Sequence, residues 1–163
     1  MNYEKHLEDV EKILEKLKLL NMECAVIVEG KKDEDALRKL CLKGVIIRII
    51  GSIPAMCEDI SKEYKKVIIL TDWDKKGGDL CKRLKKYLNA NSIKYDDRIR
   101  AELTEVCKKE IKDVESLATY VENLRRRCKL RMLRKTPYYG KRQRRFPNIL
   151  GKAFSFSKGK AFS

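Results

Sequence analysis

The chain has 163 residues and carries 39 Lys and Arg against 24 Asp and Glu, which gives a formal net charge of +15. This length suits one domain with an appendage and is enough to bury a substantial core. The sequence contains no run of about 18 apolar residues and no apolar signal-peptide core, so we expect neither a membrane span nor secretion and place the protein in the cytoplasm.

Helices and strands are predicted to alternate from the N-terminus onward. Apolar residues recur at helical spacing over 3–20, and the continuous apolar run at 24–28 indicates a strand covered on both faces. The patterns that follow predict a helix over 33–42, a strand over 45–50, a helix over 53–64, a strand over 67–71 and a helix over 79–88.

The region after residue 96 is less regular. We expect helices over 97–109 and 115–133, and the segment 111–114 between them reads either as a short fourth strand or as a loop. Alternating units of this length predict an α/β fold of three layers, α/β/α, around a small, mainly parallel central sheet. We divide the chain into an N-terminal helix packing on the core (1–21), an α/β domain (22–122) and a basic extension (123–163).

The extension carries almost all of the net charge. The last acid is Glu122, whereas residues 123–163 hold 14 Lys and Arg residues and no acid. A block of one sign repels itself and binds polyanions, so we expect 136–163 to be disordered in isolation and the extension to bind nucleic acid. Its aromatic residues fit either base stacking or anchoring to protein. The candidate contacts are Arg125, Arg126, Arg127, Lys141, Arg142, Arg144 and Arg145.

Acidic residues follow two of the predicted strands. Glu29 ends the first strand, and Asp72 and Asp74 end the third. Ligands of an open parallel sheet gather at the carboxyl ends of its strands, so the three carboxylates meet if these strands are neighbours. Carboxylates held together raise each other's pKa, and a hard cation with oxygen ligands such as Mg²⁺ relieves the repulsion.

Residues beside these acids fit a phosphate-containing substrate. Lys31 and Lys32 follow Glu29, and Lys75 and Lys76 follow Asp74, so four cations flank the predicted metal site. Aspartates are also common in turns and at helix starts, which is the structural alternative for the Asp-Trp-Asp step. Trp73 lies between the two aspartates and is expected to pack against the protein.

Two segments resemble the signature motifs of the Toprim domain: VIVEGKKDEDAL at 26–37 and ILTDWDKKGG at 69–78. The resemblance covers about 22–120 and extends to the small stand-alone Toprim proteins of archaea and bacteria and to the maturase-type ribonucleases of 5S ribosomal RNA. It implies that Glu29 is the acid/base or metal-linked glutamate and that Asp72 and Asp74 bind one or two Mg²⁺ ions, with Mn²⁺ as a substitute. Asp33 and Glu115 match further acidic positions.

The resemblance and the basic extension together suggest Mg²⁺-dependent cleavage of phosphodiester bonds in RNA. The alternative is a non-catalytic, metal-dependent module that binds RNA or a ribonucleoprotein, with the ribosome as a candidate partner. The same acids would serve both functions, so the sequence does not separate them. The sequence offers no second domain with a tyrosine nucleophile, so we do not expect a topoisomerase.

Overall fold

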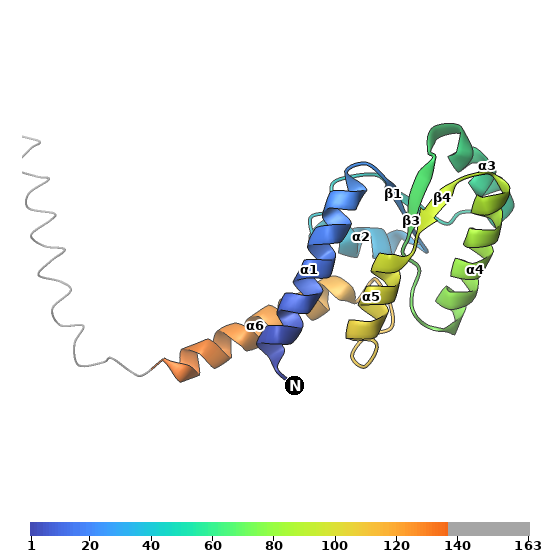
Figure 1. The fold of residues 1–163 in the computed structure, drawn as a ribbon. Helices are drawn as coiled ribbons and strands as arrows, with labels where there is room; N and C mark the ends of the chain where they lie inside the picture. The colour runs from blue at the N-terminus through green and yellow to red at the C-terminus, as the bar shows by residue number, and fades with distance from the viewer. Residues whose placement is uncertain (137–163) are drawn as a thin grey trace, which may run out of the picture. The chain divides into compact units, whose positions relative to one another are not determined.

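The computed structural model describes residues 1–136, and within them the chain forms a four-stranded, all-parallel sheet flanked by six helices (Figure 1). The sheet has the order β2-β1-β3-β4, with strands β1 (Ala25–Val28), β2 (Ile46–Arg48), β3 (Lys66–Ile69) and β4 (Lys94–Asp96). The helices are α1 (Tyr3–Asn21), α2 (Lys31–Lys39), α3 (Ile53–Glu63), α4 (Lys75–Ala90), α5 (Arg98–Cys107) and α6 (Leu117–Lys135). This arrangement confirms the predicted three-layer α/β/α class.

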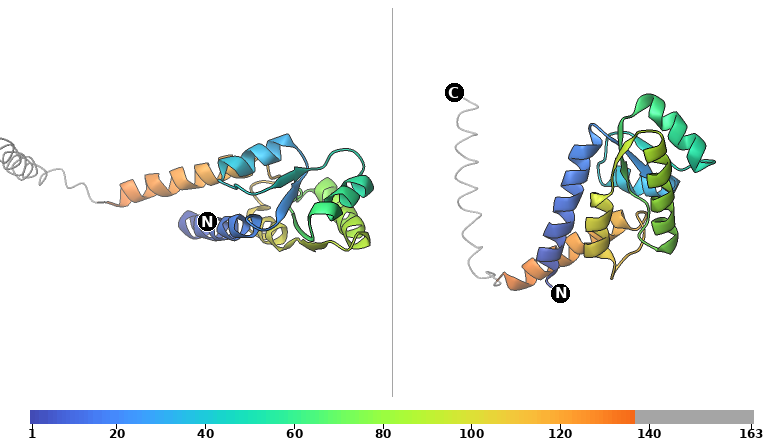
Figure 2. Two further views of the ribbon diagram at one scale, coloured as in Figure 1. Left: turned by 90° about the horizontal axis from the view of Figure 1, so that it is seen from above. Right: turned by 45° about the vertical axis from the view of Figure 1, so that its right-hand side comes forward.

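Both faces of the sheet are buried. Successive side chains of a strand point to opposite faces, and each face packs in its own hydrophobic core. Val26 and Ile68 lie in the core formed with α1, α2, α5 and the first part of α6. Ile27 and Ile69 lie in the core formed with α3 and α4. Figure 2 shows α3 and α4 together on the side of the sheet away from α1.

The chain divides into two units, Met1–Cys128 and a second that begins at Lys129, so the boundary falls inside α6. The first part of α6 belongs to the first unit because Leu117, Val121 and Leu124 continue its buried stripe. The sequence analysis placed the end of the α/β domain earlier, at residue 122. Within the described part of the chain, no helix has the length and apolarity needed to cross a membrane.

Two elements near the site differ from the prediction. The helix α4 begins at Lys75 rather than at residue 79, because Asp74 caps it and the two glycines lie inside its first turn. The fourth strand is β4, over Lys94–Asp96, whereas the segment 111–114 is a loop. The strand β4 has only three residues and lies at the edge of the sheet. Because two of its residues are a lysine and an aspartate, it has no apolar run by which the sequence could predict it.

The strand order creates a switch point between β1 and β3. After β1 the chain passes through α2 to β2, and after β3 it passes through α4 to β4 on the other side of the sheet. The helices α2 and α4 also lie on opposite faces. Chains that leave neighbouring strands in opposite directions open a crevice at the carboxyl ends of those strands, which is where α/β proteins bind ligands.

Candidate metal centre

The acids predicted from the sequence lie at this switch point. Glu29 follows β1 directly, and Asp72 lies three residues beyond the end of β3. The two strands pair in parallel with Ile27 opposite Ile69, so their carboxyl ends are level. The backbone N–H of Asp72 donates a hydrogen bond of 3.0 Å to Oε1 of Glu29. The sequence predicted that these acids meet if their two strands are neighbours, and the strands are neighbours in the sheet.

A distant segment fixes the loop that carries Asp72. The backbone N–H and the indole Nε1 of Trp73 donate to the carbonyl oxygens of Lys112 and Ile111, at 3.0 and 2.6 Å. The backbone N–H of Val114 donates to Oδ1 of Asp72 at 2.8 Å. Trp73 is half-buried against the core, as expected of a packing residue. The segment 111–114 also brings the carboxylate of Asp113, which the sequence did not single out, to the site.

Two further aspartates cap the helices that start at the site. Oδ1 of Asp74 accepts a hydrogen bond of 2.7 Å from the N–H of Gly77 and caps α4. Oδ2 of Asp33 accepts one of 3.0 Å from the N–H of Gly30, and Asp33 is buried in the first turn of α2. The structural alternative therefore holds for Asp74, and it leaves the second oxygen of that carboxylate free of hydrogen bonds within residues 1–136.

Burial and mutual repulsion raise the pKa of three carboxyl groups. Burial raises the pKa of Asp72 to about 6, and the charges of Asp33 and Asp74 add to this shift while the hydrogen bond from Val114 opposes it. The pKa of Glu29 is raised by burial and then by the charge of Asp72. The pKa of Asp33 is raised by burial and by Glu29 among its neighbours. The site therefore concentrates negative charge in a partly desolvated place.

No cation of the described chain forms an ion pair with Glu29, Asp33, Asp72 or Asp74. An all-oxygen donor set under mutual repulsion fits Mg²⁺, which would be held by Glu29, Asp72 and Asp74. Within residues 1–136, however, no group of three His, Cys, Asp or Glu side chains converges as a formed metal cluster.

The four lysines that follow the acids lie in the first turns of α2 and α4 and have different surroundings. Lys31 forms an ion pair of 3.0 Å with Asp35 on the next turn of α2. Lys75 and Lys76 are exposed in the first turn of α4, and the charge of Lys76 lowers the pKa of Glu29 against the larger raising effects. Lys76 therefore acts directly on the electrostatics of the acids.

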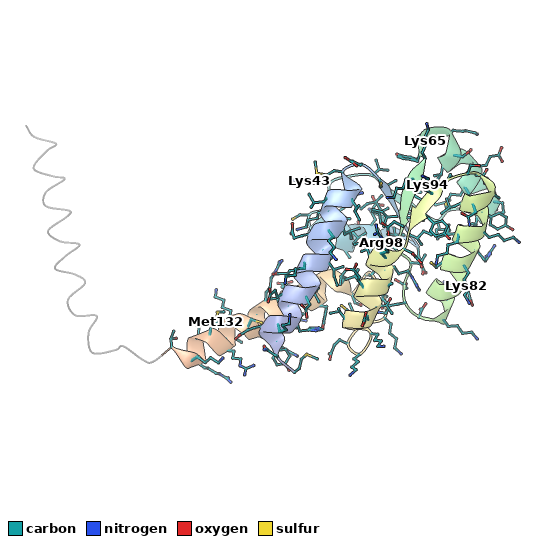
Figure 3. All side chains as sticks on the ribbon, viewed as in Figure 1. Lys43, Lys65, Lys82, Lys94, Arg98 and Met132 are labelled. Atoms are coloured by element: carbon teal, nitrogen blue, oxygen red, sulfur yellow. The ribbon has the colours of Figure 1, made fainter. Side chains whose placement is uncertain are left out.

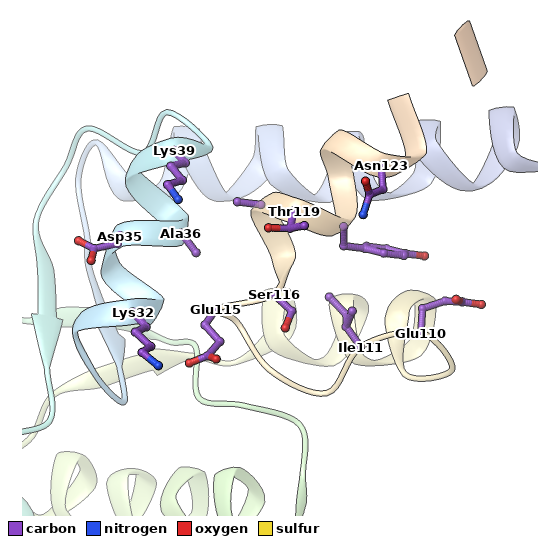
Figure 4. A pocket seen from close by; sticks show the side chains of 12 residues that line it. Lys32, Asp35, Ala36, Lys39, Glu110, Ile111, Glu115, Ser116, Thr119 and Asn123 are labelled. Atoms are coloured by element: carbon purple, nitrogen blue, oxygen red, sulfur yellow. The ribbon is translucent and has the colours of Figure 1, made fainter. Parts of the chain in front are cut away.

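The remaining lysine of these four, Lys32, lines a groove between α2 and the start of α6, with a volume of about 640 Å³. Figure 4 shows Lys32 and Glu115 at the same end of this groove, with Lys39 and Asn123 farther along it. The structure thus places Glu115 beside α2, and its charge contributes to the raised pKa of Asp33. The groove mixes both signs of charge and is not a purely basic surface.

The arginines predicted to bind nucleic acid at the start of the extension have partners within the protein. Arg125 forms an ion pair of 2.8 Å with Glu11 of α1, and Arg126 donates a hydrogen bond of 3.0 Å to Oδ1 of Asn123. The guanidinium of Arg127 lies 5.4 Å from the ring centroid of Tyr3. The other predicted contacts lie outside the described residues: Lys141, Arg142, Arg144 and Arg145.

Arg100 of α5 supports the loop of residues 71–74, a role that the sequence did not predict. Its Nε donates to the carbonyl oxygen and to Oγ1 of Thr71, both at 3.1 Å, and a terminal nitrogen donates to the carbonyl oxygen of Asp72 at 2.7 Å. Oγ1 of Thr71 in turn donates to the carbonyl oxygen of Gly77 at 2.8 Å. A single arginine in a charged helix gives no signal of this role, because the contact depends on the tertiary fold.

Comparison with known proteins agrees with this geometry. Residues 24–106 match the Toprim domain, and the chain belongs to the Toprim family. More narrowly, it is similar to the archaeal UPF0292 proteins. It is 42% identical over 116 residues to the one from Thermococcus gammatolerans, covering 71% of this chain and 83% of the relative. It is 42% identical over 125 residues to the one from Methanosarcina acetivorans, covering 76% and 87%.

A solved structure has a similar fold. A protein from Aquifex aeolicus superposes with a TM-score of 0.58 at 27% sequence identity, and the match covers 65% of this chain and 95% of that one. Toprim domains generally bind Mg²⁺ through acidic residues and act on nucleic acids, so the family gives this chain a metal-dependent function related to nucleic acid.

Proposed function

We propose that this protein cleaves phosphodiester bonds in RNA with the help of Mg²⁺. The observation that supports the proposal most directly is the meeting of Glu29 and Asp72 at the switch point, in a cluster of carboxylates without a cationic partner in residues 1–136. When bound, one or two Mg²⁺ ions, or Mn²⁺ in their place, supply charge neutralisation at the scissile phosphate and an activated water.

The residues of the chain would have separate roles. Asp72 and Asp74 hold the metal, and the hydrogen bonds from Val114 and Gly77 orient their carboxylates. Glu29 acts as general acid/base, because the raised pKa of its side chain brings it closer to neutral pH and one of its oxygens stays free of the hydrogen bond from Asp72. Lys76 and Lys32 contact phosphate oxygens on either side of the acids.

The test is a cleavage assay with labelled structured RNA and, separately, single-stranded DNA. We expect the wild type to cut the RNA in Mg²⁺ and not in EDTA, and the variants Asp72→Asn and Glu29→Gln to lose the cut. Variants purified in parallel serve as the control for a contaminating nuclease. Binding without cleavage by all three proteins would contradict the enzymatic proposal.

A metal-dependent module that binds RNA or a ribonucleoprotein without cutting is the second candidate. The observation that favours it is that Asp74 and Asp33 hold the starts of α4 and α2 by hydrogen bonds, which gives these acids a structural role that needs no reaction. This candidate predicts that Mg²⁺ strengthens RNA binding while the RNA stays intact. Co-sedimentation with ribosomes that is lost at high salt would identify the ribosome as the partner.

Removing residues 137–163 is expected to weaken RNA binding strongly. The deleted stretch contains seven Lys and Arg residues, namely Lys141, Arg142, Arg144, Arg145, Lys152, Lys158 and Lys160. If all seven neutralise phosphates of a single strand, the slope of log affinity against log salt falls by about 5, at about 0.7 for each contact. Fluorescence anisotropy at several salt concentrations measures the slope. An unchanged slope would show that residues 137–163 do not bind RNA.

A further inference from the structure

The helix α4 concentrates positive charge on its exposed side. Its sequence contains six Lys and Arg residues and one acid, Asp79. Lys85 pairs with Asp97, whereas no ion pair within residues 1–136 involves the five exposed cations of this helix, which are Lys75, Lys76, Lys82, Arg83 and Lys86. Residues 1–122 are nearly neutral as a whole, so this face stands out from the rest of the folded unit.

These cations share one surface because the opposite side of α4 is buried. Gly77, Cys81, Leu84 and Leu88 form the stripe that faces the core. From Lys75 to Lys86 the helix rises by about 17 Å. Near its start a shallow basin of about 520 Å³ is lined by Lys75, Lys76, Asp79, Leu80 and Arg83. The basin begins one residue after Asp74, so the basic face starts at the candidate metal centre.

The position of the first cations is unfavourable for the isolated helix. The N-terminus of a helix carries a partial positive charge, which favours acids there and disfavours lysines. The first turn of α4 contains Lys75 and Lys76 and no acid. By contrast, α2 also starts with two lysines, but Asp33 and Glu34 lie in its first turn. The acid at the cap, Asp74, accepts its hydrogen bond from Gly77 and forms no ion pair with either lysine of α4 within residues 1–136. Two lysines without ion pairs at the positive end of a helix are typical of a surface that binds an anion.

We infer that the exposed face of α4 binds the phosphate backbone of the RNA strand adjoining the scissile phosphate, and that the basin takes one of its phosphates. The place of the scissile phosphate rests on the proposed function. The binding itself does not, because phosphate contacts of this kind need neither the metal nor the reaction. The inference adds Lys82, Arg83 and Lys86 to the residues that contact the nucleic acid.

The test compares two triple variants of the full chain that lose the same charge. Lys82→Ala/Arg83→Ala/Lys86→Ala removes cations from α4, and Lys43→Ala/Lys65→Ala/Lys94→Ala removes exposed cations elsewhere. Lys43 precedes β2, Lys65 precedes β3 and Lys94 begins β4, so these controls lie at the amino ends of the strands. Figure 3 shows them away from Lys82. Anisotropy of a labelled single-stranded RNA is measured in EDTA over a range of salt.

The α4 variant is expected to reduce the slope of log affinity against log salt by about 2, at about 0.7 for each lost single-strand contact, while the control keeps the wild-type slope. The variant Lys82→Arg/Arg83→Lys/Lys86→Arg should also keep it. Equal losses in both alanine variants, no loss in either, or a wild type that does not bind would each overturn the inference. A loss in the charge-preserving variant would do the same. Failure of the proposed function appears separately, as absent cleavage in Mg²⁺.

Discussion

Replacing Asp72 by asparagine is expected to stabilise the metal-free protein while it abolishes the response to Mg²⁺. Burial and neighbouring carboxylates raise the pKa of Asp72 to about 6 from 3.8, so its charge opposes folding at neutral pH. Because the group is only half-buried, we discount the full shift and expect the unfolding free energy to rise by about 1–2 kcal/mol above pH 7. The amide oxygen of asparagine can still accept the hydrogen bond from Val114.

The pH dependence of this gain follows from the direction of the shift. Between pH 3.8 and about 6 the folded wild type binds more protons than the unfolded chain, so its stability falls as the pH rises through this window. The destabilisation is complete above the folded pKa and absent below the unfolded one. The advantage of Asp72→Asn should therefore be largest above pH 7 and disappear near pH 4. Urea unfolding in EDTA at several pH values measures it.

The response to added Mg²⁺ is the second measurement on the Asp72→Asn variant. A cation that binds only the folded protein raises the unfolding temperature of the wild type, and loss of a ligand removes that rise. If cleavage depends on several kcal/mol of charge stabilisation by the metal, Asp72→Asn lowers the rate at least about a hundredfold. Asp59→Asn is the control, because Asp59 is exposed on α3 and forms an ion pair with Lys62. A variant that stays sensitive to Mg²⁺ would exclude Asp72 as a ligand.

Adding one methyl group at Gly77 is expected to cost more stability than any surface change near the site. A Cβ at Gly77 would lie 1.9 Å from the backbone carbonyl oxygen of Asp72, so the first turn of α4 and the loop of residues 71–74 cannot keep their present approach. We expect Gly77→Ala to lower the unfolding free energy by more than about 2 kcal/mol. It should also weaken the Mg²⁺ response, because the strain falls on the loop that carries Asp72.

The neighbouring glycine supplies the matched control. A Cβ at Gly78 would meet its nearest atom, a guanidinium nitrogen of Arg100, at 3.9 Å, which is an ordinary contact. Alanine is favoured over glycine inside a helix, so Gly78→Ala should raise the unfolding free energy by about 0.5–1 kcal/mol. Denaturant unfolding of both variants measures the difference. Equal stabilities would mean that the close approach at Gly77 is not a constraint.

The sequence predicted those parts of the fold that depend on local patterns. Apolar runs revealed β1, β2 and β3, and helical spacing revealed the helices that cover them. Residues 94–96 gave no such signal, since an edge strand with polar side chains resembles a loop. The start of α4 was placed late because two consecutive glycines disfavour a helix, although Asp74 is a residue of the kind that caps one.

The sequence predicted which acids form the candidate site but not how they are arranged in space. The two motifs identified Glu29, Asp72 and Asp74, whose roles remain predictions. The order of strands is not encoded in any local pattern, so the pairing of β1 with β3 had to come from the structure. The same is true of Arg100 and Asp113, because contacts between residues far apart in the chain depend on packing.

The cross-bracing of residues 71–74 has a consequence for how this region opens. The amide hydrogens of Asp72 and Trp73 are bonded to Glu29 and Lys112, and Arg100 holds the carbonyls of Thr71 and Asp72. The loop is therefore tied to three stretches of chain that belong to the same buried core. Such a loop cannot fray by itself, so its amides should exchange with solvent only as slowly as the surrounding sheet, and its opening is part of one cooperative folding unit.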